Sequence, residues 1–288
     1  MTGRAAAVRG ITLVDAWRSF RTAIGLGWAV ESNWSDPFLF AVYTLAKPLA
    51  AALILVVMFQ VISGGQGTDF LQFMIVGSAL WNVVFGVMGG MVQSILEDRE
   101  RYRMLKYVVV TPSSLFPFLL GRSLARVLIS FIAVALTLGI GVLFLGIDLR
   151  PNLLYLVPAT VVGVLAVMSL GIFMASWCLQ LRQEAWHYPE AIAGALYLIS
   201  GAIFPIDVLP GVFHPIALAS PTTWWLEASR RGLLGHGSPG MLGDLSDATV
   251  FVYLLVTTAV AIPVGLALFS WFMRRARQSG LLDMVTGS

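Results

Sequence analysis

The densest cluster of charge in this chain is the segment EDRERYRMLKYVVVTP at positions 97–112, which lies between two long hydrophobic runs. Its charged side chains are Glu97, Asp98, Arg99, Glu100, Arg101, Arg103 and Lys106. As a helix, the segment would carry acidic groups near its start and basic groups toward its end, which suits the helix dipole. Apolar and aromatic residues stand among the charges, namely Tyr102, Met104, Leu105 and Tyr107. Because apolar groups rimmed by charges are typical of interfaces, the segment either docks onto a partner or anchors the chain at a surface.

The residues that could support catalysis, metal binding or nucleotide binding form no recognisable motif. The run GGQGTD at positions 64–69 lacks the lysine of a phosphate-binding loop, and no G-x-x-x-x-G-K-[ST] occurs. The histidines lack the H-E-x-x-H spacing of a zinc site, and they are His187, His214 and His236. The single cysteine, Cys178, provides neither an intrachain disulfide nor a cysteine metal cluster. We therefore predict that the chain is not an enzyme and holds no cofactor or metal, with an intramembrane enzyme as the weaker alternative.

The composition is typical of a membrane protein. Of the 288 residues, 58% are hydrophobic and 11% are charged, whereas soluble domains carry roughly 25% charged residues. The mean hydropathy is +0.85. Several apolar runs reach the roughly 20 residues that a helix needs to cross the hydrocarbon core, and none alternates with the two-residue period of a barrel strand. We expect an all-α polytopic membrane protein with no removable signal peptide and no role in nucleic-acid binding.

Six hydrophobic runs predict six transmembrane helices. They cover residues 38–62, 70–95, 113–147, 153–179, 191–204 and 249–273, and the third is too long for one straight span. Basic residues gather on the side of both termini, which the positive-inside rule assigns to the cytoplasm. The predicted parts are a cytoplasmic N-terminal region (1–37), a single transmembrane domain (38–273) and a cytoplasmic tail (274–288). The transmembrane domain would include a cytoplasmic loop at 96–112 and an extracytoplasmic segment at 205–248.

An amphipathic helix is predicted ahead of the first run. Leu13, Trp17, Phe20, Ile24 and Trp28 recur at spacings of three and four. This spacing gives one apolar helix face, which suits a helix that lies in the membrane interface. Packing of the same helix against the bundle is the alternative.

Two arginines interrupt the third hydrophobic run. Arg122 and Arg126 are four residues apart, so they share one face of a helix. In the first interpretation both side chains reach lipid phosphates at the inner surface. In the second they face a polar cavity or a partner helix.

Prolines divide the apolar segment that follows the fifth predicted span. Because proline ends helical turns, we expect a re-entrant segment that enters the membrane from outside and returns. The candidates for a substrate path or gate are Phe204, Pro205, Pro210, Trp224, Glu227 and Arg230. Trp224 and Trp225 suit an interfacial belt, which is the alternative to substrate contact. Glu227 and Arg230 are three apart on a predicted helix and close enough to pair, either as a structural salt bridge or as an external gate.

Two blocks of the sequence resemble ABC-2 type transporter permeases, the membrane subunits of ABC exporters. YRMLKYVVVTP at positions 102–112 is similar to the cytoplasmic loop of that family. SGAIFPIDVLPGVFHPIALASPTTWWLEASRRGLLG at positions 200–235 is similar to the segment that follows the family's fifth span. Arg103, Met104 and Lys106 stand where the family usually has glycine, threonine and glutamate, which makes this loop more basic.

The resemblance implies a coupling helix, at about positions 97–109, that lies against a separate ATP-binding subunit. The residues expected at this contact are Glu97, Glu100, Arg101, Tyr102, Arg103, Leu105, Lys106 and Tyr107. It also implies two copies of the ATP-binding subunit, which hold ATP and magnesium. A second permease subunit, expected to be another copy of this chain, and membrane lipids complete the partners.

The function implied by the resemblance is export across the cell (inner) membrane, with both termini cytoplasmic. We expect an amphipathic substrate, either a drug-like compound or a lipid, because WAVESNWSDPFLFAVY differs from the aromatic-rich first span of glycan exporters. Export of a polysaccharide or a lipid-linked glycan is the alternative. An ion-coupled secondary transporter is a further alternative, which the placement of almost all carboxylates in loops or at span ends disfavours.

Overall fold

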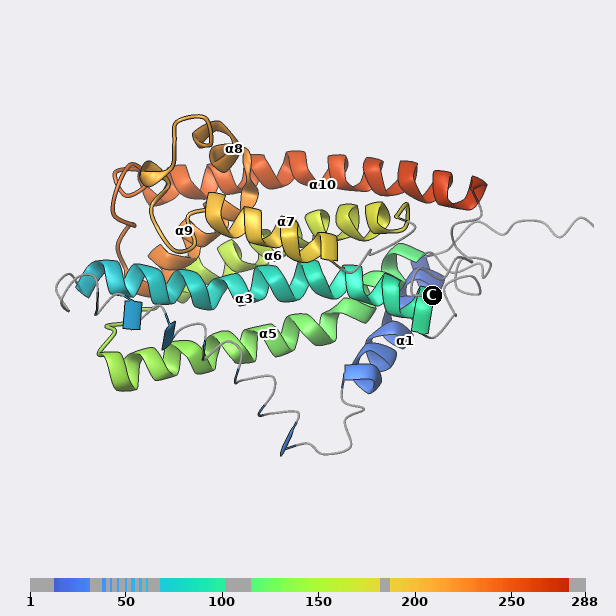
Figure 1. Cartoon of the computed structure of the whole chain (residues 1–288), viewed down its shortest axis with the longest axis horizontal. Coiled ribbons are helices and arrows are strands. Elements are labelled where there is room, and N and C mark those ends of the chain that lie inside the picture. The colour runs from blue at the N-terminus through green and yellow to red at the C-terminus, as the bar shows by residue number, and fades with distance from the viewer. Residues whose placement is uncertain are drawn as a thin grey trace, which may run out of the picture.

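A computed structural model shows a bundle of helices (Figure 1). It describes residues 13–31, 68–101, 115–181 and 187–279, together with single positions between 38 and 61. Within these residues every regular element is a helix. In chain order they are α1 (Leu13–Glu31), α3 (Thr68–Leu96), η1 (Glu97–Arg101), α5 (Leu115–Leu145), α6 (Leu153–Cys178), α7 (His187–Ile199), η2 (Ile206–Val208), α8 (His214–Ala219), α9 (Pro221–Leu234) and α10 (Asp247–Gln278).

Four long helices, α3, α5, α6 and α10, form the body of the molecule. Each is long enough and apolar enough to cross a membrane. α3 packs against α5 and α6, and α6 packs against α10, with all four extending along the long axis in Figure 1. α1 contacts α5 at one end of the bundle, which we call the α1 end, whereas α9 lies among α3, α6 and α10 toward the other, the α9 end.

The outer surface of the bundle is apolar. On α5, Leu128, Ile132 and Leu136 are exposed at intervals of four residues. On α10, Val252 and Val256 are exposed at the same interval. Apolar stripes of this kind are unfavourable in water and favourable against lipid. The chain is therefore a membrane protein.

Four of the predicted hydrophobic runs form the long helices, but the third run differs from expectation. It forms one continuous helix, α5, of 31 residues, so the prediction that it is too long for a single straight span is wrong. Pro117 does not interrupt α5 because it stands in the first turn, where no backbone hydrogen bond is lost. A long helix can be accommodated in a bilayer by tilting.

The remaining two predicted spans have different outcomes. The fifth run forms α7, which has 13 residues and is shorter than the roughly 20 that full crossing requires. The first run lies mostly outside the described residues, although its described positions, such as Phe38 and Val61, are helical and exposed. The count of six spans stays a prediction.

α1 packs directly onto α5. A Cβ atom at Gly27 would lie 2.6 Å from the carbonyl oxygen of Arg122, and one at Gly121 would lie 2.8 Å from the Cβ of Ala23. Only glycine permits such close contact between the two helix backbones. The face that packs carries Ala23 and Gly27, while Trp17 and Trp28 are exposed. Packing against the bundle is thus observed, and contact of the exposed tryptophans with lipid headgroups stays a prediction.

Short helices connect α7 to α10 at the α9 end. η2 and α8 follow Pro205, and α9 then enters the bundle and ends at Gly235, whose φ of 78° is a left-handed conformation. After a loop of residues 236–245, the Ser246 side chain accepts a hydrogen bond from the Thr249 backbone and caps α10. The predicted helix carrying Glu227 is therefore α9.

Candidate functional site

Two arginines of α5 anchor a network of charges at the α1 end. Arg122 and Arg126 lie about one helical turn apart, as their spacing predicts. Nη2 of Arg122 lies 3.3 Å from Oε2 of Glu97 and 3.2 Å from Oδ1 of Asp98. Both carboxylates belong to η1, which continues α3. Arg122 therefore fixes α5 to the first residues of the charged segment.

Arg126 extends the network to α1 and α3. Its guanidinium pairs with Glu31 at the end of α1 and donates to Oε1 of Gln93 on α3. Its Nη2 also lies 3.2 Å from Oε1 of Glu97. A Cβ at Gly90 would lie 2.9 Å from Cδ of Arg126, so glycine leaves room for the arginine stem along α3. We call Glu31, Gln93, Glu97, Asp98, Arg122 and Arg126 the α1-end network.

The α1-end network is largely withdrawn from solvent. The side chains of Arg122 and Asp98 are 2% and 0% exposed, and that of Arg126 is 17% exposed. Charges at such positions are stable only when ion pairs and hydrogen bonds offset the loss of hydration. Each carboxylate of the network faces an arginine. Of the two interpretations of the arginine pair, contact with partner helices is the one observed.

The charged segment begins as a continuation of α3. Glu97 and Asp98 belong to η1, and α3 runs through Leu96 into η1 without a break. Arg99 is 3% exposed, and its Nη1 donates to the carbonyl oxygen of Leu179 at the end of α6, at 3.5 Å. Movement of η1 would thus be transmitted to α5 through Arg122 and to α6 through Arg99.

The residues expected at the coupling contact are only partly described. Glu97 belongs to the α1-end network, and Glu100 and Arg101 end η1. The others lie outside the described residues, and they are Tyr102, Arg103, Leu105, Lys106 and Tyr107. Their role in coupling stays a prediction.

A pocket of about 160 Å³ lies between α3 and α7, beside the network. Its apolar wall includes Met88 and Val92 of α3 and Ala193 of α7. Its polar groups are Gln93 of α3 with His187 and Glu190 of α7. Gln93 therefore takes part in both the pocket and the α1-end network.

The α9 end holds a second cluster of buried charge, centred on Arg231. Its Nε lies 2.8 Å from Oε1 of Glu227, and its Nη1 lies 2.8 Å from Oδ1 of Asp247 at the start of α10. The same guanidinium donates to the carbonyl oxygens of Leu245 at 2.7 Å and Leu242 at 2.6 Å. Arg231 thus holds the loop between α9 and α10 against α9. The predicted pair of Glu227 with Arg230 is wrong, because the ion pair forms one residue further along.

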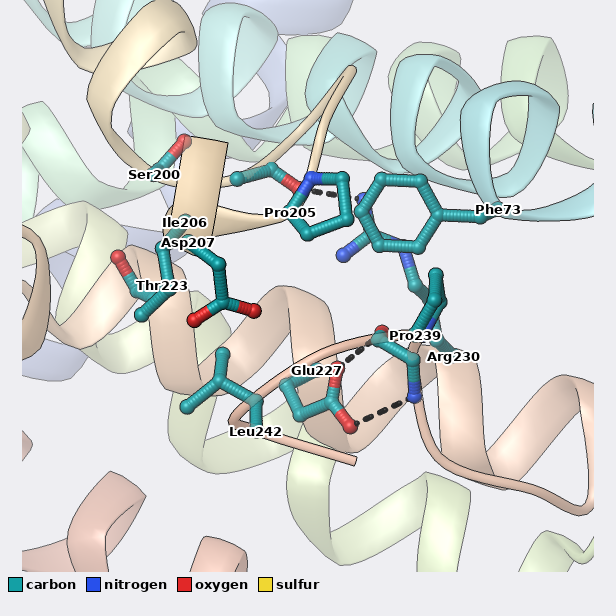
Figure 2. Close-up of a pocket in the computed structure, with 12 residues that line it drawn as sticks. Phe73, Ser200, Pro205, Ile206, Asp207, Thr223, Glu227, Arg230, Pro239 and Leu242 are labelled. Atoms are coloured by element: carbon teal, nitrogen blue, oxygen red, sulfur yellow. Dashed lines mark hydrogen bonds between the residues drawn. The ribbon is translucent and has the colours of Figure 1, made fainter. Parts of the chain in front are cut away.

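Glu227 closes this cluster from α9. Its side chain is 0% exposed, and it accepts hydrogen bonds from the backbone N–H of Ser238, at 3.1 Å, and from the Ser238 hydroxyl. Figure 2 shows Glu227 facing the cavity that Arg230 also enters. We call Glu227, Arg231, Ser238, Leu242, Leu245 and Asp247 the α9 cluster.

Arg230 forms no ion pair with Glu227 and instead contacts the opposite side of that cavity. Its Nη2 donates to the carbonyl oxygens of Gly201 at 2.7 Å and Ala202 at 2.8 Å. Its guanidinium carbon lies 3.7 Å from the centroid of the Phe73 ring, a cation–π contact (Figure 2). Burial lowers the pKa of Arg230 to about 10, so the side chain keeps its charge at neutral pH. The cavity, about 10 Å³, is large enough for about one water molecule.

The other residues proposed for the gate range from buried to exposed. Trp224 is 3% exposed, stacks on Tyr253 with ring centroids 4.5 Å apart and donates to the carbonyl oxygen of Leu218 at 2.7 Å. Trp225 is 0% exposed and lies over Gly163 of α6. Both tryptophans pack inside the chain, so their assignment to an interfacial belt is wrong. Pro205 lines the cavity of Figure 2, Phe204 is partly buried and Pro210 is exposed.

Several residues of these clusters were not singled out from the sequence, among them Arg231, Glu31 and Gln93. Arg231 stands four residues after Glu227, a helical spacing that could have identified it. Glu31 pairs with a residue 95 positions away, and Gln93 with one 33 positions away. No local pattern signals such long-range contacts.

Comparison with known families gives a match over most of the chain. A family model described as ABC-2 type transporter matches residues 26–234. The match extends from α1 through the whole of α9 and includes every residue of the α1-end network. Comparison with curated proteins gave no match.

Proposed function

The chain belongs to the ABC-2 type transporter family, and we propose that it is the permease subunit of an ATP-driven exporter of amphipathic compounds. The observation that carries the proposal is the α1-end network, which ties the first residues of the charged segment to α1, α3 and α5. A subunit that docks onto the rest of the segment could move all three helices through these ion pairs.

The docking partner in this proposal is an ATP-binding subunit, present in two copies that hold ATP and magnesium. Tyr102, Leu105 and Tyr107 would supply the apolar contacts, and the basic residues of the segment would supply the rim. Closure of the two subunits would push on η1. Because Arg122 and Asp98 are almost fully buried, the ion pairs are poorly screened and resist separation.

The pocket between α3 and α7 supports a small amphipathic substrate. Its wall is mostly apolar with a few polar groups, as is typical of sites for such compounds. Its volume of about 160 Å³ would hold one ring or headgroup. A polysaccharide would need a wider path, which favours a drug-like compound or lipid over the glycan alternative.

Gln93 connects substrate and energy source in this scheme. Its side chain lines the pocket, and its Oε1 accepts a hydrogen bond from Arg126. A change in the pocket would therefore alter the α1-end network. The ion-coupled alternative would need an ionisable group in the middle of a span, whereas the carboxylates of the network lie at helix ends and are paired.

At the opposite end, we assign a gating role to the segment from Phe204 to Arg230. α9 and the α9 cluster would form its rigid part, and the exposed Pro210 side would form its mobile part. A second copy of the chain would complete the path. With the basic α1 end in the cytoplasm of an inner membrane, export would proceed toward the α9 end.

The proposal is tested by purifying the tagged chain from its native membrane in mild detergent and identifying its partners by mass spectrometry. We expect a subunit with a G-x-x-x-x-G-K-[ST] motif to accompany the wild type. Leu105→Asp should release it, because a carboxylate replaces an apolar contact. Asp148→Asn, at an exposed site of the α9 end, is the control and should retain it.

Two results would contradict the proposal. One is a wild type that stays dimeric and carries no ATP-binding subunit, which would favour the ion-coupled transporter. The other is a Leu105→Asp variant that binds the subunit as well as the wild type, which would remove the charged segment from the contact.

A further inference from the structure

The pocket between α3 and α7 contains a carboxylate that the α1-end network does not use. Glu190 and His187 lie one turn apart on α7 and both line the pocket. Among the described residues, neither side chain makes a hydrogen bond or an ion pair with another. The other carboxylates of this end, Glu31, Glu97 and Asp98, all face arginines. Glu190 and His187 are both exposed, so Glu190 gives the accessible edge of the pocket a negative charge that no described cation pairs.

The position of Glu190 in its helix also disfavours an anionic ligand. It stands in the first turn of α7, where its carboxylate offsets the positive end of the helix dipole. The helix terminus is thus already balanced by a residue of the chain. A ligand anion in the pocket would meet Glu190 directly, and the described residues that line the pocket include no lysine or arginine.

Gln93 defines the opposite polar side of the pocket. Arginine offers only donors, so the atom of Gln93 that faces Arg126 must be its carbonyl oxygen. The amide nitrogen is the remaining polar atom of that side chain. A ligand here could accept a hydrogen bond at Gln93 while it places positive charge near Glu190.

The apolar wall suits the carbon portion of such a ligand. Phe85, Met88, Val92 and Leu96 of α3 line the pocket over three turns of the helix. Aromatic rings and methionine sulfur are soft, polarizable surfaces that tolerate a cation nearby. The volume of about 160 Å³ is close to that of a cavity which holds benzene. The pocket can therefore hold one aromatic ring, with a substituted ammonium group beside the exposed Glu190.

We propose that this pocket binds an amphiphile with a cationic amine, the amine against Glu190 and the apolar portion against Met88 and Val92. The inference rests on the proposed function, because it names the substrate class of the same pocket. The amine could belong to a soluble compound or to a lipid headgroup, since both present the same chemistry.

The test is a binding titration of the full chain in nanodiscs of phosphatidylglycerol, with radiolabelled benzyltrimethylammonium as the probe and empty nanodiscs subtracted. Unlabelled neopentylbenzene, in which carbon replaces the charged nitrogen, and benzylsulfonate serve as neutral and anionic competitors. We expect the cation to bind, and the two competitors to displace it at least about tenfold less well than unlabelled cation, a factor that corresponds to about 1.4 kcal/mol.

Five variants test the charge and the cavity. Glu190→Gln should weaken cation binding about tenfold, and Glu190→Asp should retain most of it. Asp148→Asn removes one negative charge from the opposite end and should have no effect. Gly89→Leu places an apolar side chain at the pocket wall, where nothing lies within 4 Å of a Cβ, and should abolish binding. Gly139→Leu on α5, equally open, should not.

A lipid source of the amine is recognised by adding phosphatidylethanolamine to the nanodiscs. Competition by the lipid would weaken probe binding to the wild type while leaving Glu190→Gln unchanged, and absence of competition would point to a soluble ligand. Either result supports the cationic chemistry.

The proposal is overturned if the wild type fails to bind the cation, if the neutral or anionic competitor matches it, or if Glu190→Gln binds like the wild type. Because these titrations use the chain without an ATP-binding subunit, they are independent of the co-purification experiment. A charge-selective pocket in a chain without such a subunit would overturn the proposed function alone.

Discussion

The α1-end network and the α9 cluster both bury arginines against carboxylates, but they join different parts of the chain. In the α9 cluster, Arg231 contacts residues 4 to 16 positions away, and several of its acceptors are backbone carbonyls. In the network, Arg126 contacts Gln93 and Glu31, which are 33 and 95 positions away and belong to separate helices. The first arrangement closes a local loop, whereas the second connects elements that can move relative to one another.

This difference suggests that the α9 cluster mainly stabilises the fold, whereas the α1-end network mainly transmits movement between helices. A guanidinium that satisfies fixed backbone carbonyls has few alternative partners, so it rigidifies the loop between α9 and α10. Arg122 and Arg126 share Glu97 as an acceptor, and their other partners among the described residues are also side chains. Side-chain pairs can be exchanged as helices shift. We therefore expect substitutions in the α9 cluster to affect mainly folding, and substitutions in the network to affect mainly the response to ATP.

The largest loss of stability is expected for Arg231→Ala. It leaves Glu227, which is 0% exposed, without its cation, and such a change typically costs about 3–5 kcal/mol. Thermal unfolding of the purified chain, followed by fluorescence-detected size exclusion, measures the effect. A midpoint equal to that of the wild type would show that the cluster does not stabilise the fold.

Gly163→Ala should be the next most disruptive. A Cβ at this position would clash with the ring of Trp225, which is fully buried, and overpacking of this kind costs about 1–3 kcal/mol. Gly194→Ala on α7 is the matched control, because nothing lies within 4 Å of a Cβ there. The same unfolding assay should place the control at or above the wild type. Equal midpoints for both variants would contradict the tight contact between α6 and α9.

Arg126→Met should cost less than Arg231→Ala. Arg126 is 17% exposed and Glu97 keeps Arg122 as a partner, so partial solvation limits the loss to about 1–2 kcal/mol. Urea titration of the detergent-solubilised chain can rank the two variants. A larger loss for Arg126→Met would reverse the proposed division between the two clusters.

Arg150→Ala should have the smallest effect. Arg150 and Asp148 form an ion pair at 2.7 Å, but their side chains are 75% and 62% exposed. Exposed pairs contribute little because water and salt screen them. The unfolding midpoint should not change measurably at any salt concentration, and a clear decrease would indicate that this loop carries a role beyond its own ion pair.

Much of the helical architecture could be predicted from the sequence, because long apolar runs identify helices that cross a membrane. The arginine pair of α5 could also be flagged, since charge within an apolar run needs a partner. The identity of that partner could not, because the contact with Glu31 depends on how α1 crosses α5. Glycines at positions 27 and 121 set that crossing, and their effect is visible only once both backbones are placed.

The errors at the α9 end have a similar cause. Arg230 and Arg231 are both within reach of Glu227 along a helix, so spacing alone does not choose between them. The choice is made by Phe73 and by the carbonyl oxygens of Gly201 and Ala202, which hold Arg230 at the opposite side of the cavity from Glu227. Long-range packing decides these positions, and it leaves no periodic signal in the sequence.

The first measurement we would make is the distance between spin labels on α1 and α6 in the complex with the ATP-binding subunit. Cysteines replace Trp28 and Leu154, which are 52% and 88% exposed, in a Cys178→Ala background. If the network transmits movement, trapping the subunits with ATP and vanadate shifts the distance, and Arg126→Met abolishes the shift while ATP hydrolysis continues. A shift that persists in Arg126→Met, or a wild type in which ATP changes nothing, would contradict the role of the α1-end network.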